Sequence, residues 1–392
     1  MGKSIDKLYI FPFIVVKYRY LLKGGISMSR ILLSPAKYVQ GKGELARLAQ
    51  YVLTLGQKPF ILISASGQKR FGKVLSDGFN GAVSFEIFGG ECCQQEIDRV
   101  TAQYTQSGCD VLVAVGGGKI FDTAKCVSIQ TNAPIAIVPT IASTDAPCSA
   151  VAVVYTPDGV PEKSMHMAKN PDVVVVDSQV IADAPVRLFV AGMGDALATF
   201  FEARACQRGD GNNSARAKST LASVALAQLC YETLLADGLR AKVAVEKRLC
   251  TKAVENVIEA NTLLSGIGFE SGGLAAAHPV QDGLSLFPET HAMYHGEKVA
   301  FGTLVQLVLE NAPAEELEEV VHFCQSVGLP TTLCALGLHN PDKEQILKAA
   351  ELAAKQRCMG NLPFDVTADD IADAIWAADA IGHYYGDADC CC

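Results

Sequence analysis

The chain has 392 residues, of which 49% are apolar and 19% charged, and its formal net charge is -9. With a mean hydropathy of +0.22, this composition excludes a disordered chain, whose residues would be polar and highly charged. The excess of acidic over basic residues argues against a nucleic-acid binder, which needs a basic surface. We therefore expect a globular protein of two domains that acts on a small molecule.

The two ends of the chain and its cysteines indicate where the protein works. Residues 1–27 form an extension of unknown role, because the apolar run Leu8–Val16 is too short to cross a bilayer and no cleavage site follows it. Three of the 14 cysteines end the chain at Cys390–Cys392, and no Cys-x-x-Cys pair occurs. Scattered cysteines in so long a chain predict small buried hydrophobes, and the simplest location is a reducing cytoplasm, away from any membrane.

Short apolar runs alternate with helical stretches between residues 58 and 177. Runs that are apolar on both faces and separated by helices predict a parallel sheet covered on both sides. The predicted strands are Phe60–Ser64, Val83–Phe88, Val111–Val115, Ile135–Val138, Ala150–Tyr155 and Val173–Asp177. Residues 28–186 are therefore predicted to form a doubly wound α/β domain of the dinucleotide-binding type.

Helix-forming residues take over after Ala184. Alanine, leucine and glutamate recur with apolar spacings of three and four residues, which predicts packed helices. The clearest stretches are Ser219–Leu235, Thr251–Leu264 and Glu344–Ala354. The expected fold class is α/β plus all-α, with a helical-bundle domain over residues 187–392.

A strand that ends in three glycines and runs into a helix is the most informative motif of the first half. Glycines 116, 117 and 118 let a ligand approach the backbone, and the free N–H groups of the next helical turn attract phosphate oxygens. Gly116, Gly117 and Gly118 are thus predicted to hold a pyrophosphate. The pattern is neither G-x-G-x-x-G nor the Walker sequence, so a ligand-free tight turn stays an alternative.

A hydroxyl-rich segment, Val138–Ser149, leaves the next predicted strand. Ligands of open α/β sheets lie outside the carboxyl ends of the strands, so this segment and the glycine loop should face one crevice. Asp145 lies in the segment between two prolines. Taken by itself, an aspartate followed by Ala-Pro favours an ordinary Asx turn.

A carboxylate and two imidazoles in the second half suggest a metal site. Asp195 stands among apolar and small residues, where an acid is costly to bury without a positive partner. His278 follows a run of small residues and His295 opens another motif; one carboxylate with two imidazoles is common in catalytic zinc sites and also suits Fe²⁺. The wide spacing leaves a packing role open. His291 is ambiguous, and the remaining histidines are interpreted as core residues: His166, His322, His339 and His383.

Several segments together match a known family. They are Phe-Gly-Gly-Glu-Cys at 88–92, Gly-Gly-Gly-Lys-x-x-Asp-Thr-Ala-Lys at 116–125, Pro-Thr-Ile-Ala-Ser-Thr-Asp-Ala-Pro-Cys-Ser-Ala at 139–150, Gly-Asp-Ala-Leu-Ala-Thr at 194–199, Phe-Glu-Ala-Arg-Ala-Cys at 201–206, Gly-Phe-Glu-Ser-Gly-Gly-Leu-Ala-Ala-Ala-His at 268–278 and His-Gly-Glu-Lys-Val-Ala-Phe-Gly at 295–302. From about Ser34 to Gly382 the chain resembles the glycerol dehydrogenases of the iron-containing alcohol dehydrogenase and dehydroquinate synthase superfamily.

The resemblance implies an active site in the cleft between the two domains. It implies a Zn²⁺ ion on Asp195, His278 and His295, contact of Asp145 with substrate, NAD as coenzyme and a homo-oligomer. The family's dinucleotide contacts fall on Gly118, Lys119, Ile120, Phe121, Asp122, Thr140, Ile141, Ala142, Ser143, Ser149, Val151 and Tyr155. The implied reaction oxidises glycerol, or a similar vicinal diol, to dihydroxyacetone with hydride transfer to NAD.

The chain departs from the family pattern at two positions, and three other functions remain as alternatives. The segment Phe60–Arg70 lacks the acid that usually holds the ribose hydroxyls after the second strand, so NADP is an alternative coenzyme. Gln281 stands where relatives often carry another histidine. The rivals are a glycerol-phosphate dehydrogenase, a dehydroquinate synthase and a non-catalytic nucleotide-binding sensor. The intact Asp195, His278 and His295 argue against the sensor.

Overall fold

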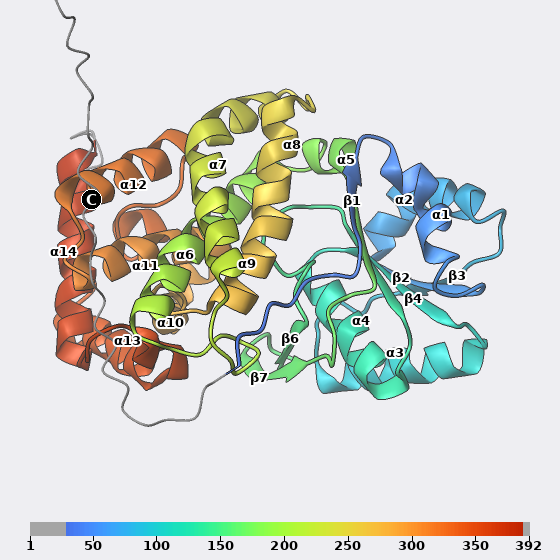
Figure 1. Cartoon of the computed structure of the whole chain (residues 1–392), viewed down its shortest axis with the longest axis horizontal. Coiled ribbons are helices and arrows are strands. Elements are labelled where there is room, and N and C mark those ends of the chain that lie inside the picture. Colours follow the sequence, from blue (N-terminus) through green and yellow to red (C-terminus); the bar gives the residue numbers. More distant parts are fainter. Residues whose placement is uncertain (1–28, 387–392) are drawn as a thin grey trace, which may run out of the picture.

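The computed structural model describes residues 29–386. The expectations for the extension and for Cys390–Cys392 lie outside these residues. Within them, a parallel sheet with its helices adjoins a larger helical half (Figure 1).

The main sheet is parallel throughout, in the order β1-β8-β5-β4-β2-β3. Its strands are β1 (Tyr38–Gly41), β2 (Pro59–Ile63), β3 (Ser84–Ile87), β4 (Val111–Gly116), β5 (Ile135–Pro139) and β8 (Val173–Asp177). The helices of this half are α1 (Leu48–Val52), α2 (Ala65–Gly78), α3 (Gln94–Ser107), α4 (Gly118–Thr131) and α5 (Ser178–Ala182), preceded by a 3₁₀ turn at Glu44–Arg47.

Alternate residues of the central strands enter two separate apolar cores. On β4, Leu112 and Ala114 pack with residues of α3 and α4, whereas Val113 and Val115 pack with residues of α1 and α2. Both sets are buried, as expected for strands of a parallel sheet that is covered by helices on both faces. The predicted doubly wound arrangement is therefore confirmed.

One predicted strand is assigned to the wrong sheet. The run Ala150–Tyr155 forms β6 (Val151–Tyr155), which pairs antiparallel with β7 (Pro161–His166) in a sheet of its own. The place at the sheet edge belongs instead to β1, which the sequence did not predict because Tyr-Val-Gln-Gly is short and only half apolar. The alternation of half-buried and buried side chains along β6 marks it as a strand with one covered face.

The helical half begins with α6 (Val186–Arg208). It continues through α7 (Leu221–Glu246), α8 (Lys252–Glu259), α9 (Ser265–Gly272), α10 (Ala277–Leu284), α11 (His295–Leu309), α12 (Ala314–Val327), α13 (Lys343–Lys355) and α14 (Ala368–Tyr385). A π-helical turn, Ala260–Leu264, joins α8 to α9, and short 3₁₀ turns lie at Pro288–Ala292, Cys334–Leu336 and Arg357–Asn361. The predicted α/β plus all-α class is confirmed. The division into domains at residue 186 stays a prediction; the described residues before β1 already contact the helical half, where the Leu33 amide donates to Ser271 Oγ at 2.8 Å.

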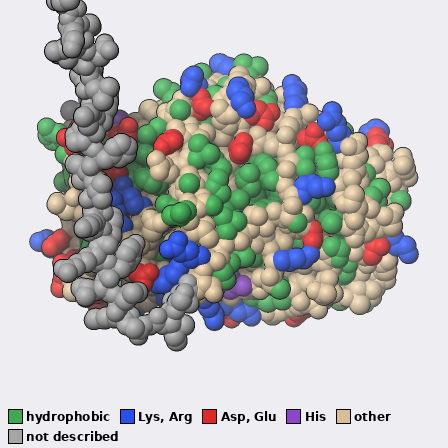
Figure 2. All heavy atoms as spheres, in the orientation of Figure 1, with side chains coloured by type: hydrophobic (Ala, Val, Ile, Leu, Met, Phe, Trp, Pro, Cys, Tyr) green, Lys and Arg blue, Asp and Glu red, His purple; other side chains and the backbone are tan. Residues whose placement is uncertain are grey.

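Most of the described cysteines are small buried hydrophobes, as predicted. Those that are both buried and free are Cys92, Cys93, Cys126, Cys148, Cys206, Cys230 and Cys324. Between residues 29 and 386 no helix has the length and hydropathy needed to cross a membrane. On the face shown in Figure 2, exposed hydrophobic side chains lie between scattered charged ones.

α6 and α11 pass so close to each other that their contact requires glycine. A Cβ atom on Gly194 would overlap the carbonyl oxygen of Gly296, and a Cβ atom on Gly296 would overlap that of Ala191. Gly194 immediately precedes Asp195, and Gly296 immediately follows His295. The closest approach of the two helices therefore places these two side chains next to each other.

We expect Gly296→Ala to destabilise the protein by about 1–3 kcal/mol, because the added methyl group must push α6 and α11 apart. Urea denaturation measures this change. Gly360→Ala is the matched control, since a Cβ atom there has no neighbour within 4 Å. Equal unfolding midpoints for the two variants would contradict the tight contact.

Candidate active site

The three predicted metal ligands come together from three helices. Asp195 lies on α6, His278 on α10 and His295 at the first residue of α11. The Nε2 atoms of His278 and His295 lie 3.5 and 3.2 Å from Asp195 Oδ1, and one ligand atom from each residue lies within 4.8 Å of the other two. Asp195 is 1% exposed, whereas the His295 side chain is 42% exposed, so the cluster is buried on one side and open on the other.

The donor set fits a divalent cation. Asp195 Oδ1 is buried and accepts no hydrogen bond, although two imidazole nitrogens approach it. A buried carboxylate oxygen without a partner is costly, and a cation between the three ligands would supply one. One carboxylate and two histidines leave coordination positions for a substrate oxygen.

A second carboxylate holds His278 in place. Glu202 of α6 is fully buried, and its Oε2 lies 2.5 Å from His278 Nδ1. Its Oε1 accepts hydrogen bonds from the Ala275 and His278 amides at 2.9 and 3.2 Å. Nδ1 therefore donates to Glu202 and Nε2 faces the metal ligands, which is the carboxylate–histidine arrangement typical of metal centres. Glu202 is not among the predicted site residues, although it lies in the matched segment 201–206.

The charges of the cluster depend on one another. Burial raises the pKa of Asp195, but the imidazoles of His295 and His278 outweigh it and hold that pKa below its usual range. Burial lowers the pKa of His278, but the Glu202 and Asp195 carboxylates outweigh it and raise that pKa well above its usual range. The two buried carboxylates therefore favour positive charge between them, which a bound cation would supply.

Asp145 is joined directly to this cluster. Its amide donates to Asp195 Oδ2 at 3.2 Å, and its own Oδ2 accepts from Ser265 Oγ at 3.0 Å. Burial, followed by the nearby Asp195 carboxylate, raises the pKa of Asp145 well above its usual value. Asp145 therefore lies beside the three predicted metal ligands, and the Asx-turn alternative does not explain its bond to Ser265.

The glycine loop and the hydroxyl-rich segment lie side by side, as predicted. The Thr140 amide donates to the Gly116 carbonyl at 2.9 Å, because β4 and β5 are neighbours and both end here. A Cβ atom on Gly118 would meet nothing within 4 Å, so the first turn of α4 opens onto free space. This opening at the start of a 14-residue helix suits a pyrophosphate.

The other predicted dinucleotide contacts differ in how accessible they are. Ile120, Phe121 and Ala142 are buried in the core, so a ligand would meet their backbone rather than their side chains. Lys119 is exposed and pairs with Glu91 Oε2 at 2.5 Å, with its ammonium 5.3 Å from the Tyr155 ring centre. Thr140, Ile141 and Ser143 are half-buried at the crevice. The roles assigned to these residues stay predictions.

A buried lysine anchors the far end of the hydroxyl-rich segment. Lys125 on α4 is fully buried, and its Nζ donates to the carbonyls of Ala146 and Val151 at 2.7 and 2.9 Å and to Ser149 Oγ at 3.3 Å. Ser149 and Val151 are therefore bound to the protein itself. Because Lys125 follows the glycine loop on the same helix, it couples the phosphate-binding turn to the segment that carries Asp145.

The helical half holds the same segment from the other side. Asn261, in the π-helical turn, donates to the Ala142 carbonyl at 3.1 Å, and Glu270 on α9 accepts from the Ala150 amide at 2.7 Å. Together with Ser265, these side chains line one continuous helical stretch. Glu270 lies in the matched segment 268–278 but was assigned no role. Asn261 and Ser265 lie in no motif, because single polar residues in an apolar helix do not reveal their partners.

The remaining polar groups near the cluster surround Ser285. Lys298 Nζ and Gln281 Nε2 donate to its hydroxyl at 2.7 and 2.8 Å, so Gln281 occupies the place of the expected histidine without joining the metal ligands. Burial lowers the pKa of Lys298, while the Asp282 carboxylate opposes that shift.

The other histidines lie outside the cluster. The interpretation of four of them as core residues is wrong, since His166, His322, His339 and His383 are exposed on the surface. The ambiguous His291 is exposed and lies 3.2 Å from the Ser285 carbonyl. His322 and His383 lie on the exposed faces of α12 and α14, whose opposite faces are buried, so apolar neighbours in the sequence did not predict burial.

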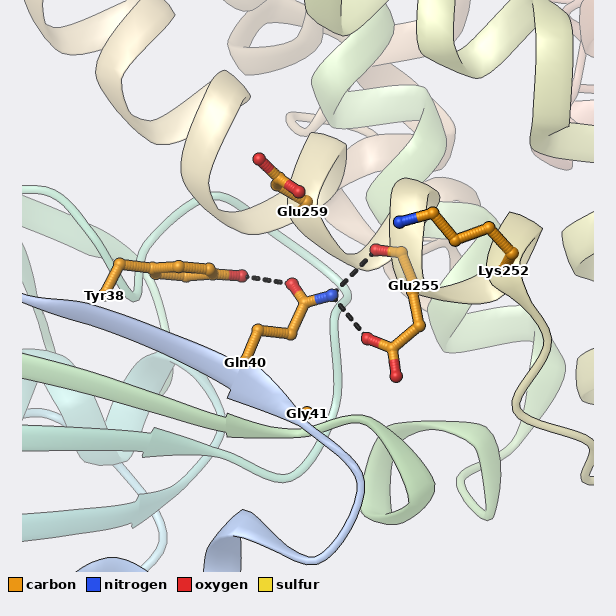
Figure 3. A pocket seen from close by; sticks show the side chains of 6 residues that line it. All are labelled: Tyr38, Gln40, Gly41, Lys252, Glu255 and Glu259. Carbon is orange, nitrogen blue, oxygen red and sulfur yellow. Dashed lines mark hydrogen bonds between the residues drawn. The ribbon is translucent and has the colours of Figure 1, made fainter.

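A separate hollow of about 430 Å³ lies between β1 and α8. None of the residues that line it belongs to α6, α10 or α11, the helices that carry Asp195, His278 and His295. Its side chains bind one another: Gln40 Nε2 donates to the Glu255 carbonyl and carboxylate at 2.9 and 2.6 Å, and the Tyr38 hydroxyl donates to Gln40 at 2.6 Å (Figure 3). The Tyr38 hydroxyl also lies 2.8 Å from Thr262 Oγ1 in the π-helical turn. These bonds fasten the edge of the sheet to the helical half.

Comparison with known proteins places this fold and site in one class. Residues 35–178 match the model of the iron-containing alcohol dehydrogenase family. Glycerol dehydrogenase from Citrobacter freundii is 45% identical over 362 residues, which cover 91% of this chain and 99% of that protein. The chain therefore belongs to the iron-containing alcohol dehydrogenase family.

Within that family, the similar proteins include several glycerol dehydrogenases. The crystal structure of a probable glycerol dehydrogenase from Sinorhizobium meliloti 1021 superposes with a TM-score of 0.87 at 47% identity, covering 91% of this chain and all of the other. A glycolaldehyde reductase from Halobacterium salinarum is 40% identical over 91% of this chain and 98% of its own length.

We expect Glu202→Gln to weaken metal binding about 10- to 100-fold, because the amide no longer fixes and polarises His278. Titration of the metal-free protein with Zn²⁺, followed by calorimetry, measures the affinity. Glu351→Gln on an exposed position of α13 is the matched control. Unchanged affinity in Glu202→Gln would mean that Glu202 only packs behind His278.

The buried Asp122 predicts a dependence of stability on pH. Burial raises the pKa of its carboxyl to about 7, against the attraction of Lys125. The folded state then keeps a proton that the unfolded chain loses near pH 4, so the free energy of unfolding falls as the pH rises from about 4 to about 7.

We expect Asp122→Asn, which stays neutral, to gain about 2–3 kcal/mol relative to the parent protein between pH 5 and pH 8. Urea denaturation of both proteins at the two pH values gives this difference. A constant difference across that range would show that Asp122 is ionised throughout.

Proposed function

We propose that this protein is an NAD-dependent glycerol dehydrogenase that oxidises glycerol, or a similar vicinal diol, to dihydroxyacetone. The observation that carries the proposal is the convergence of Asp195, His278 and His295 beside Asp145. The glycerol dehydrogenases among its relatives support the choice of substrate.

The chain's own residues would divide the work of the reaction. Asp195, His278 and His295 would hold a divalent cation, which supplies a Lewis acid that favours the alkoxide form of a substrate hydroxyl. Glu202 binds Nδ1 of His278 and thereby orients its Nε2 toward the place of the cation. Asp145 would contact a neighbouring substrate hydroxyl, at a position set by the Asp195 carboxylate and the Ser265 hydroxyl.

The crevice would bring substrate and coenzyme together. The turn at Gly116, Gly117 and Gly118 would bind the pyrophosphate, and the segment Thr140–Ser143 would flank the nicotinamide, which accepts the hydride. Asn261 holds that segment at the Ala142 carbonyl, and Lys125 holds the continuation of the same loop at the Ala146 carbonyl. The loop is thus fixed from the two halves of the protein, so that the reacting carbon would meet the nicotinamide ring in a fixed geometry.

The similarity to a glycolaldehyde reductase suggests a second candidate function, the reduction of a hydroxyaldehyde. Reduction of a hydroxyaldehyde uses the same hydride transfer in reverse, and the same metal would polarise the aldehyde oxygen. The two functions differ in the preferred substrate pair rather than in the residues that perform the chemistry.

The metal, the location and the assembly belong to the same proposal. We propose Zn²⁺ as the resident metal, with Fe²⁺ as the alternative that this ligand set also suits. We also propose a cytoplasmic homo-oligomer that uses NAD. After β2, Ser64 caps α2 and its Oγ lies 3.2 Å from Ser66 Oγ. This stretch presents no acid to the ribose, so NADP is the alternative coenzyme.

The test is the absorbance of reduced nicotinamide with glycerol as substrate, before and after treatment with a chelator and after return of Zn²⁺ or Fe²⁺. We expect a loss of rate of at least about 100-fold on chelation and its recovery with metal. The same assay with glycolaldehyde and with NADP ranks the substrates and coenzymes. Coenzyme binding without turnover of any diol or hydroxyaldehyde would favour a nucleotide-binding sensor instead.

A further inference from the structure

Asp282 is a carboxylate beside the predicted metal ligands that has no partner of its own. It lies on α10 one helical turn after His278, so the two side chains project from the same face of that helix. The ligand atoms of the metal cluster lie within 4.8 Å of one another, and Asp282 is not among them. It is half-buried, and no group of residues 29–386 donates a hydrogen bond to its carboxylate or forms an ion pair with it. Its oxygen atoms are therefore open to a ligand.

Charged and titratable groups from both halves of the protein lie within electrostatic reach of Asp282. Burial raises the pKa of its carboxyl, and the imidazoles of His278 and His295 and the ammonium group of Lys298 oppose that shift. In the α/β half, burial raises the pKa of Tyr155 on β6, and Asp282 is one of several acidic groups that add to this shift. Asp282 therefore lies near the predicted metal ligands and near a predicted coenzyme contact, which is where the substrate must be held.

The neighbouring cation is bound elsewhere. Lys298 on α11 is 8% exposed, and its Nζ donates to Ser285 Oγ at 2.7 Å. Gln281 Nε2 donates to the same hydroxyl at 2.8 Å, and that hydroxyl donates to the Gln281 carbonyl at 2.9 Å. Ser285 thus holds the Lys298 ammonium group, which offsets the charge of Asp282 without occupying its oxygen atoms.

This arrangement suits a neutral substrate with a hydroxyl beyond those that the metal would bind. Side chains one helical turn apart, such as His278 and Asp282, are about 5–6 Å apart at Cβ, which is comparable with the length of a three-carbon polyol. A carboxylate oxygen accepts hydrogen bonds from hydroxyl groups, and such charge-assisted bonds are stronger than those between neutral groups. A phosphate or carboxylate in place of that hydroxyl would instead be repelled by Asp282.

We infer that Asp282 is a specificity-determining residue that accepts a hydrogen bond from the substrate hydroxyl farthest from the metal. The site then favours neutral triols and longer polyols over diols that lack this hydroxyl. The inference rests on the proposed function and goes beyond it, because it names the part of the substrate that the chain distinguishes. A site that binds a hydroxyl discriminates against the analogue without it, since its own polar group then stays unpaired.

The experiment compares glycerol with 1,2-propanediol, which is glycerol without one terminal hydroxyl. In Asp282→Ala, kcat/KM for glycerol should fall at least about tenfold, whereas kcat/KM for 1,2-propanediol should stay within about twofold of the parent value. Asp282→Asn, which keeps the size and one acceptor oxygen, should show a smaller loss in the same direction. Asp373→Ala is the matched control, because Asp373 is exposed on α14, and it should change neither value.

The ratio of the two kcat/KM values separates substrate recognition from a structural role, which would lower both values together. Equal losses with both substrates, or an unchanged value with glycerol in both Asp282 variants, would overturn the inference and leave the proposed function standing. A parent protein that oxidises neither compound would overturn the proposed function, and the inference with it. A loss confined to glycerol supports both.

Discussion

The site depends on the contact of α6 with α11. Two helices whose axes come this close cannot carry side chains at the point of contact, and Gly194 and Gly296 satisfy that requirement. Their sequence neighbours are Asp195 and His295, and this contact brings Asp195 Oδ1 within 3.2 Å of His295 Nε2. Asp195 itself is buried. The convergence of ligands that are distant in the sequence is thus a consequence of backbone packing.

The burial of the carboxylates in this cluster favours the binding of a cation. Asp195 and Glu202 are carboxylates in the interior of α6, one with an oxygen that has no hydrogen-bond partner. Such groups are tolerated only when positive charge compensates them. A stripe of polar residues on the helical half, from Asn261 to Glu270, then reaches the segment that carries Asp145. Lys125 reaches it from α4. The cluster of Asp195, His278 and His295 and the glycine turn are therefore connected through one loop that both halves hold.

Local sequence patterns predicted most of the strands and helices. They did not predict features that depend on contacts between residues far apart in the sequence. Strands β2, β4, β5 and β8 were predicted because short, continuous apolar runs between helical stretches are typical of buried parallel strands. The edge strand β1 was missed because its pairing, rather than its residues, makes it a strand. The cluster of Asp195, His278 and His295 was predicted from residue chemistry together with family motifs, and the structure brings these three residues together. Glu202, Ser265 and Lys125 were not assigned roles, because each acts through a partner that lies far away in sequence or that only the fold brings near.

The most direct test of the account is anomalous X-ray diffraction from crystals of the purified protein, with data collected on both sides of the zinc and iron absorption edges. The account requires one strong peak, about 2.0–2.3 Å from an oxygen of Asp195 and from Nε2 of His278 and of His295. The edge at which the peak appears identifies the metal. Crystals of active protein with no peak between these three side chains, or with the metal bound elsewhere, would contradict it.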